Sequence, residues 1–168
     1  MILKILSALS VTIIGGVIGA AQADKLSESR KNCTEIGEMI HHTVFSIEYR
    51  GDDVYAICRR LKNDSDLRRL TFLQNLPEEY VCGQDFREMW DRAVILQKNL
   101  GEEEREILFR CGGIIGKSDA GGQIAMLGEL QEKIRKIEEQ RIDMAAKKGR
   151  LYRSAGLLFG IMAGIIVI

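Results

Sequence analysis

The segment Cys111–Ser118, which reads C-G-G-I-I-G-K-S, comes closer than any other stretch to a motif that could do chemistry. The loop that cradles nucleotide phosphates needs G-x-x-x-x-G-K, then serine or threonine, directly after a buried apolar strand. Here Cys111 stands at the first glycine position, and the preceding stretch is charged and helical in pattern. No acidic residue follows an apolar strand to hold magnesium. We therefore interpret the segment as a glycine-rich turn between two helices, with Lys117 in solvent and Ser118 or Asp119 as a helix cap.

The cysteines and histidines lack the spacing of metal ligands or of a catalytic pair. The cysteines are Cys33, Cys58, Cys82 and Cys111. They stand far apart, without a C-x-x-C pair, so a zinc site is not expected. His41 and His42 are neighbours, and on a helix their side chains point about 100° apart, so they cannot share one metal ion. We expect reduced thiols, no metal, no cofactor and no enzymatic activity.

Charged side chains gather in two clusters of opposite sign. The basic cluster consists of Arg59, Arg60, Lys62, Arg68 and Arg69, and the acidic cluster of Glu102, Glu103, Glu104 and Glu106. Complementary charge steers the encounter of proteins, so Arg59, Arg60, Arg68 and Arg69 are candidate docking residues for a cytoplasmic partner. The alternative is a solvated face. The chain as a whole has 24 basic and 24 acidic residues. This balance argues against nucleic-acid binding, which usually needs a basic excess.

Both ends of the chain are nearly free of charge. No charged residue lies between Ile5 and Ala23, or between Ser154 and Ile168. The N-terminal run of about 19 residues reaches roughly 28 Å as a helix, close to the bilayer core of about 30 Å. The C-terminal run is shorter and needs bilayer thinning, snorkelling flanks or a packing partner. We predict an N-terminal transmembrane helix over residues 1–23 and a C-terminal membrane helix over residues 154–168.

The orientation follows from the basic residues that flank these two segments. Ala21-Gln22-Ala23 gives the N-terminal run a second interpretation, a cleaved signal peptide. The flanking basic residues are Lys25, Arg30, Lys31, Lys147, Lys148, Arg150 and Arg153. These seven lie on the side of the middle region, whereas only Lys4 precedes the N-terminal run. An excess of basic residues marks the cytoplasmic face of a membrane. We therefore predict that residues 24–153 form a cytoplasmic helical bundle that is moored to the lipid bilayer.

Glycines recur at four-residue spacing in both membrane segments. They are Gly15 and Gly19 in the first, and Gly156, Gly160 and Gly164 in the second. Such stripes let helix backbones approach closely in lipid, so these residues are candidate packing positions against each other or against another membrane protein. The alternative is that glycine is simply frequent in membrane helices.

The middle region predicts an all-α fold. No stretch alternates as a strand, and apolar residues recur at spacings of three and four. The expected helices cover residues 24–49, 54–61, 67–76, 84–99, 102–115 and 119–153. The first and last continue into the membrane segments and leave the same membrane face with opposite chain direction. We therefore expect a roughly six-helix bundle in which these two long helices pair antiparallel as a stalk.

Several dispersed positions carry a family resemblance. They are Ile47-Glu48-Tyr49 before Gly51, Trp90, Leu108-Phe109, Gly112, Ile115-Gly116, Ser118-Asp119, Gln123 and the closing segment Gly149–Ile168. With these positions the chain resembles the stage III sporulation protein AB family over essentially its whole length. The run Arg110-Cys111-Gly112 departs slightly from the family pattern.

The resemblance implies a function that the residues alone do not name. The family belongs to the machinery built during endospore formation between mother cell and forespore. It is similar to the cytoplasmic domains of the inner-membrane platform of type II secretion and type IV pilus systems, which bind a secretion ATPase. The resemblance thus implies a platform in the outer forespore membrane whose bundle faces the mother-cell cytoplasm. Its implied partners are the stage III sporulation protein AA ATPase and other membrane components of the sporulation channel.

The residues also leave other functions open. The main alternative is a membrane-tethered helical signalling adaptor or sensor, with the long helices as its output element. An enzyme and a secreted helical protein are further options, each with less support from the sequence.

Overall fold

The computed structural model describes the backbone of residues 2–167 and the side chains of residues 17, 21, 24, 27–144, 154 and 158. The chain divides into two compact units, one made of Met1–Arg30 with Glu139–Ile168 and the other of Lys31–Glu138. Among the residues described, no helix combines the length and apolar character that a membrane crossing requires. The predicted glycine positions Gly15, Gly19, Gly156, Gly160 and Gly164 lie outside the residues whose side chains are described.

Helices make up the fold, and residues 2–167 contain no strand, which confirms the predicted all-α class. The α-helices are α1 (Ile2–Phe45), α2 (Val54–Lys62), α3 (Phe86–Leu96), α4 (Glu102–Ile114) and α5 (Ala120–Val167). A π-helix, η1 (Ser46–Arg50), follows α1 without a break, and two 3-10 helices, η2 (Ser65–Leu67) and η3 (Thr71–Asn75), follow α2. The two longest helices are the first and the last, as predicted.

The predicted α-helix over residues 67–76 is wrong, and the described part of the chain therefore has five α-helices. Leu67, Leu70, Leu73 and Leu76 are all buried. Their spacing of three matches the three-residue turn of a 3-10 helix rather than the 3.6 residues of an α-helix. The backbone bonds follow the same spacing, because each of the last three leucine N–H groups donates to the leucine carbonyl three residues earlier, at 3.0–3.2 Å. Two short 3-10 helices thus bury one apolar stripe.

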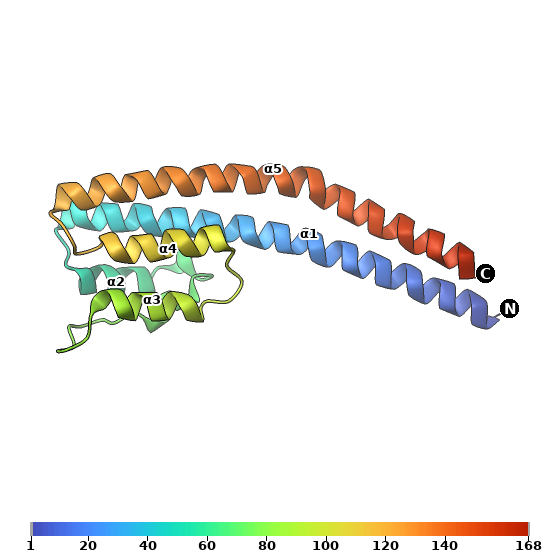
Figure 1. Ribbon diagram of the computed structural model, residues 1–168, viewed down its shortest axis with the longest axis horizontal. Helices are drawn as coiled ribbons and strands as arrows, with labels where there is room; N and C mark the ends of the chain where they lie inside the picture. The colour runs from blue at the N-terminus through green and yellow to red at the C-terminus, as the bar shows by residue number, and fades with distance from the viewer. Residues whose placement is uncertain (1, 168) are drawn as a thin grey trace. The chain divides into compact units, whose positions relative to one another are not determined.

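The unit Lys31–Glu138 is a bundle around one apolar core. Within it, α1 and α5 lie side by side and antiparallel (Figure 1), with Thr34 Oγ1 donating to Glu138 Oε1 at 2.6 Å. Gly37 faces Ile134 one turn further along. The helices α3 and α4 pack against each other, with Trp90 fully buried between them and its Nε1–H donating to the Leu108 carbonyl at 2.7 Å. The predicted antiparallel pairing of the first and last helices is confirmed for this unit.

Three of the four cysteines belong to this core. Cys33, Cys58 and Cys111 are buried, Cys82 is exposed on the loop before α3, and all four are free thiols. Burial raises the pKa of the Cys58 and Cys111 thiols to about 12. Because the thiolate is the reactive form, both are inert at neutral pH, and Cys82 is the accessible one.

Candidate docking groove

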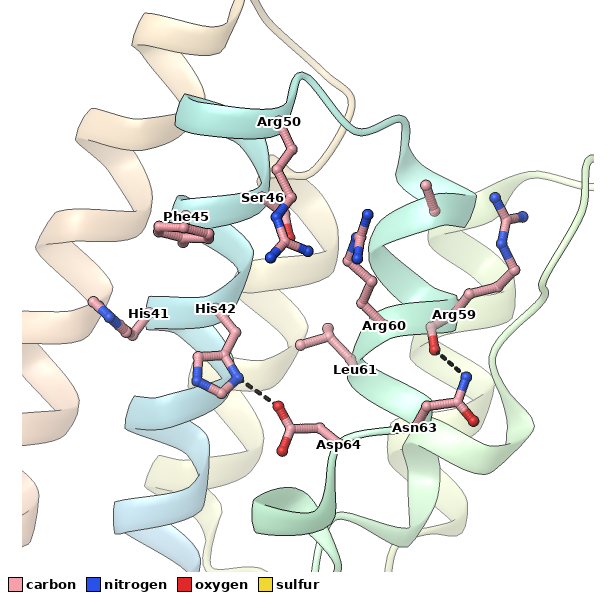
Figure 2. A pocket seen from close by; sticks show the side chains of 11 residues that line it. His41, His42, Phe45, Ser46, Arg50, Arg59, Arg60, Leu61, Asn63 and Asp64 are labelled. Carbon is pink, nitrogen blue, oxygen red and sulfur yellow. Dashed lines mark hydrogen bonds and ion pairs between the residues drawn. The ribbon is translucent and has the colours of Figure 1, made fainter.

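An open groove of about 780 Å³ runs between the end of α1 and the neighbouring helix α2 (Figure 2). We call it the α1–α2 groove. Its lining residues are His41, His42, Phe45, Ser46, Arg50, Ala56, Arg59, Arg60, Leu61, Asn63 and Asp64. One wall comes from α1 and η1, the other from α2, and the turn after α2 closes one end.

The π-helix η1 shapes the first wall. The Gly51 N–H donates to the Ser46 carbonyl five residues earlier, and Gly51 has the positive φ of 61° that ends the helix. This wider turn brings Arg50 over the ring of Phe45, with 5.2 Å from the guanidinium carbon to the ring centroid. In a regular α-helix, neighbours on one face lie three or four residues apart, not five. Short π-helical turns occur frequently at functional sites.

The first wall carries an exposed aromatic side chain, Phe45, which pairs with a second one on η1. The rings of Phe45 and Tyr49 lie tilted to each other at 5.0 Å between centroids, and these residues are 42% and 69% exposed. Arg50 forms no ion pair with any residue that the structure describes. The first wall therefore offers a guanidinium fork without a carboxylate partner, beside two aromatic rings that can cover apolar atoms.

The second wall is the polar side of the amphipathic helix α2. Asp53 caps its start, because the Asp53 carboxylate accepts from the Ala56 N–H at 2.7 Å. Ile57 and Leu61 are buried against the core, whereas the Arg60 side chain remains 51% exposed. Asp52 holds Arg60 through a 2.6 Å contact to Nε, which leaves the terminal nitrogens of the guanidinium facing the groove (Figure 2).

A contact between an imidazole and a carboxylate closes the groove at the end of α2. His42 Nδ1 lies 2.6 Å from Asp64 Oδ2 and joins α1 to the turn after α2. The Asn63 side chain donates to the Arg59 carbonyl at 2.8 Å and fixes the same turn. The bottom of the groove is thus rigid, and its cationic side chains lie nearer the open end (Figure 2).

The structure separates the four predicted docking arginines instead of joining them in one patch. Arg60 points into the α1–α2 groove, whereas Arg59 points away from it (Figure 2) and donates to the Glu78 carbonyl. Arg68 lines a separate hollow beside η2 and forms no ion pair with the residues described. Arg69 is held by Glu35 of α1, at 3.3 Å from Nε to Oε1.

Sequence reasoning missed Arg50, Phe45 and His42 as parts of the groove. For the adjacent histidines the spacing excluded a shared metal ion but gave no carboxylate partner. The one available signal was Gly51, which marks a helix end. No sequence pattern shows that the last turn before it is π-helical.

The segment that resembled a phosphate loop forms a helix end and a turn. Cys111 to Ile114 are the last residues of α4. Gly116 has a positive φ of 75° and donates its N–H to Gln123 Oε1 at 2.8 Å, while Gln123 Nε2 donates to the Ser118 carbonyl at 2.7 Å. A turn between two helices is confirmed, and Gln123 fastens it, but only Gly116 lies in that turn, whereas Gly112 and Gly113 belong to α4.

The sequence model described as Stage III sporulation protein AB matches residues 4–168. The chain belongs to this family. No curated protein and no solved structure matches the chain. The family positions that carried the resemblance have structural roles in this stage III sporulation protein AB chain: Gly112 and Trp90 meet in the core, and Gly116 and Gln123 build the turn before α5.

Proposed function

We propose that this chain is a membrane-anchored, non-enzymatic platform of the sporulation channel that docks a secretion-type ATPase, the stage III sporulation protein AA ATPase. Membership of the family supports a role in sporulation. The sequence resemblance to secretion-system platform domains supports the ATPase as partner. The uncharged runs 5–23 and 154–168 support membrane anchoring, in the outer forespore membrane with the bundle in the mother-cell cytoplasm.

The structural observation that supports docking most directly is the α1–α2 groove. Its cationic side chains face an open space, and Arg50 pairs with no carboxylate among the residues described. An excess of one charge on a concave surface, here three arginines against Asp64, favours encounter with a partner of the opposite sign. Exposed aromatic rings at the rim add the kind of side chain that dominates protein interfaces.

The proposed mechanism is mechanical. Phe45 and Arg50 belong to the end of α1 and the turn that continues it, and α1 begins at Ile2 within the predicted N-terminal membrane segment. ATP hydrolysis in the bound partner would reorient the bundle, and the long helices α1 and α5 would carry that movement to the membrane. There the glycine stripes Gly15–Gly19 and Gly156–Gly164 would pack against other membrane components of the channel.

Direct binding tests the proposal. We expect the purified ATPase to bind full-length chain in lipid nanodiscs, and the affinity to fall as salt concentration rises, because salt screens exposed charges. Biolayer interferometry against empty nanodiscs measures both. If both proteins are folded by circular dichroism and no binding is found at low salt, ATPase docking is excluded.

Cys82 offers a test of orientation. In growing cells made to express the chain, a membrane-impermeant maleimide is expected to label Cys82 only after permeabilisation, since the bundle is proposed to be cytoplasmic. The other three thiols are buried, so Cys82→Ser should remove the labelling that native protein shows. A gel shift after treatment with the reagent measures it. Labelling of intact cells that disappears in Cys82→Ser would show that the bundle is exported.

A further inference from the structure

Cationic side chains lie on both sides of α2, and on the outer side a loop of the chain itself binds them. On the outer side, the loop between η3 and α3 brings Glu78 onto α2, where Lys62 binds the Glu78 carboxylate and Arg59 donates to the Glu78 carbonyl. The hydrogen bond from Lys62 and its charge lower the pKa of the Glu78 carboxyl, so the pair is charged at neutral pH. The outer cations of α2 are therefore taken by the chain's own acidic loop.

An aromatic side chain accompanies this acidic contact. Tyr80, two residues after Glu78, places its ring edge-to-face on Tyr55 of α2 at 6.3 Å between centroids. Tyr55 packs in the same way on Phe86, at 6.2 Å. The segment Pro77–Val81 reads P-E-E-Y-V. It shows which ligand the cations and rings of this helix accept: a carboxylate followed closely by an aromatic ring.

The α1–α2 groove, on the inner side of α2, also offers cations and an aromatic ring: Arg60 comes from α2, and Arg50 and Phe45 come from the opposite wall. Arg50 and Arg60 reach in from opposite walls (Figure 2), and Phe45 and Tyr49 form an exposed aromatic pair beside them. Asp52 holds Arg60 by Nε, and Arg50 has no ion pair with a residue that the structure describes. Guanidinium forks recognise carboxylates with two parallel hydrogen bonds.

We propose that the α1–α2 groove binds an acidic, aromatic segment of a partner protein, whose carboxylates pair with Arg50 and Arg60 and whose aromatic side chain packs on Phe45 and Tyr49. The inference rests on the proposed function only in taking the ATPase as the protein that supplies this segment. Of the four candidate docking arginines the proposed site uses only Arg60, because Arg59 points away from the groove (Figure 2) and Arg69 is held by Glu35.

A synthetic peptide tests the groove without the ATPase. The probe is fluorescein-labelled GPEEYVGPEEYV, which repeats the acidic-aromatic order of the chain's own loop, and the protein is full-length chain in phosphatidylcholine nanodiscs. We expect saturable binding by fluorescence anisotropy. Arg50→Gln should raise Kd about ten-fold or more, because a hydrogen bond to a charged group is worth at least one decade of affinity.

Matched controls separate recognition in the groove from general attraction of charge. Arg68→Gln removes the same charge from an exposed arginine outside the groove, so it should leave Kd unchanged within about two-fold. The peptides GPQQYVGPQQYV and GPEEAVGPEEAV, which lack the carboxylates and the rings respectively, should each bind at least about five-fold more weakly. Equal losses for Arg50→Gln and Arg68→Gln, or equal binding of the glutamine peptide, would overturn the inference.

Two further outcomes distinguish this inference from the proposed function. If Arg50→Gln loses the peptide but keeps full affinity for the ATPase, the groove does bind acidic segments and the ATPase docks elsewhere. If the wild-type chain dimerises, fails to bind the peptide and becomes monomeric as Arg50→Gln in sedimentation, the groove belongs to a second copy of the chain and the inference is wrong.

Discussion

Replacing Gly112 with alanine is expected to destabilise the bundle by about 2 kcal/mol. A Cβ atom at this position would lie 2.5 Å from Cγ and 2.7 Å from Nε1 of Trp90. These are atoms of a rigid ring in the core, and overpacking a core costs about 1–3 kcal/mol. Because Trp90 is rigid, we take the upper end of this packing cost, about 3 kcal/mol. Alanine recovers about 1 kcal/mol of helix propensity, which leaves the net loss of about 2 kcal/mol.

Trp90 cannot easily move to make room. Its N–H donates to the buried Leu108 carbonyl at 2.7 Å. Its ring also packs against Phe72 and Phe86, at 5.4 and 5.9 Å between centroids. A shift of the indole would strain or break the hydrogen bond and open gaps on both sides, and an unsatisfied buried polar group costs about 1–3 kcal/mol.

Two other helical glycines serve as controls for Gly112→Ala. Gly113→Ala would meet only the end of the flexible Arg87 side chain, which can swing away, so the expected change is within about 0.5 kcal/mol. Gly128→Ala meets nothing within 4 Å in the middle of α5 and is expected to stabilise by about 0.5–1 kcal/mol.

Urea unfolding of the full chain in detergent measures these three variants. Trp90 is the single tryptophan and reports directly on the core of the bundle. The expected order of midpoints, at unchanged slope, is Gly128→Ala above wild type, Gly113→Ala near it and Gly112→Ala well below. A midpoint for Gly112→Ala equal to that of Gly113→Ala would show that the indole moves aside at no cost.

This contrast also explains why the segment around Gly112 resembled a nucleotide site. Glycine is found both where a backbone approaches phosphate and where a helix approaches a large ring. The charged stretch before Cys111 argued against the phosphate site and predicted a turn, and the structure shows that Gly112 lies against a large ring instead. What the sequence could not provide was the identity of the ring, because Trp90 lies on another helix and only the tertiary fold brings the two together.

Local signals predicted the helices well where a cap and an apolar stripe agreed. Asp53 at the start of α2 and the glycine-bounded start of α4 are examples. The prediction of an α-helix from Leu67 to Leu76 is wrong because the leucines recur strictly every three residues, whereas one face of an α-helix needs spacings of both three and four. A strict period of three indicates a 3-10 helix. Such helices are usually short, and here the chain forms two of them.

The groove was predictable only in part. The arginines on α2 follow from its amphipathic pattern, and Arg60 does lie in the groove. Arg50 could not be predicted, because its place over Phe45 depends on a π-helical turn that adds one residue to the repeat. The hydrogen bond of Arg59 to the Glu78 carbonyl and the ion pair of Arg69 with Glu35 could not be predicted either, because each joins residues far apart in the sequence.

Gln97→Leu is expected to lower the free energy of unfolding by about 3 kcal/mol, although leucine and glutamine have similar volumes. Gln97 is buried at the end of α3, where Oε1 accepts from Thr71 Oγ1 at 2.9 Å and from the Phe72 N–H at 2.8 Å. Its Nε2 donates to the Arg69 carbonyl at 2.9 Å and to the Lys98 carbonyl at 3.2 Å. The side-chain amide of Gln97 thus satisfies the Arg69 carbonyl and the Phe72 N–H at the start of η3.

Leucine fills the same space but offers no hydrogen bond. The Phe72 N–H and the Arg69 carbonyl would then lose their partner inside the protein, and each such group costs about 1–3 kcal/mol. Thr71→Val removes one bond from the same oxygen and leaves the other three intact, so about 1 kcal/mol is expected. The same urea titration compares the two variants, and a smaller loss for Gln97→Leu than for Thr71→Val would contradict the role of the amide.

Gln97→Glu separates loss of the donor from loss of packing. It keeps an acceptor for Thr71 and Phe72 but turns a second oxygen toward the Arg69 and Lys98 carbonyls, so at neutral pH it should be at least as unstable as Gln97→Leu. In acid the carboxyl carries a proton and can donate to a carbonyl again. Its midpoint relative to wild type should therefore rise as pH falls from 7 to about 4, whereas that of Gln97→Leu should not. Parallel pH profiles for the two variants would mean that the loop around η3 is held by its leucines alone.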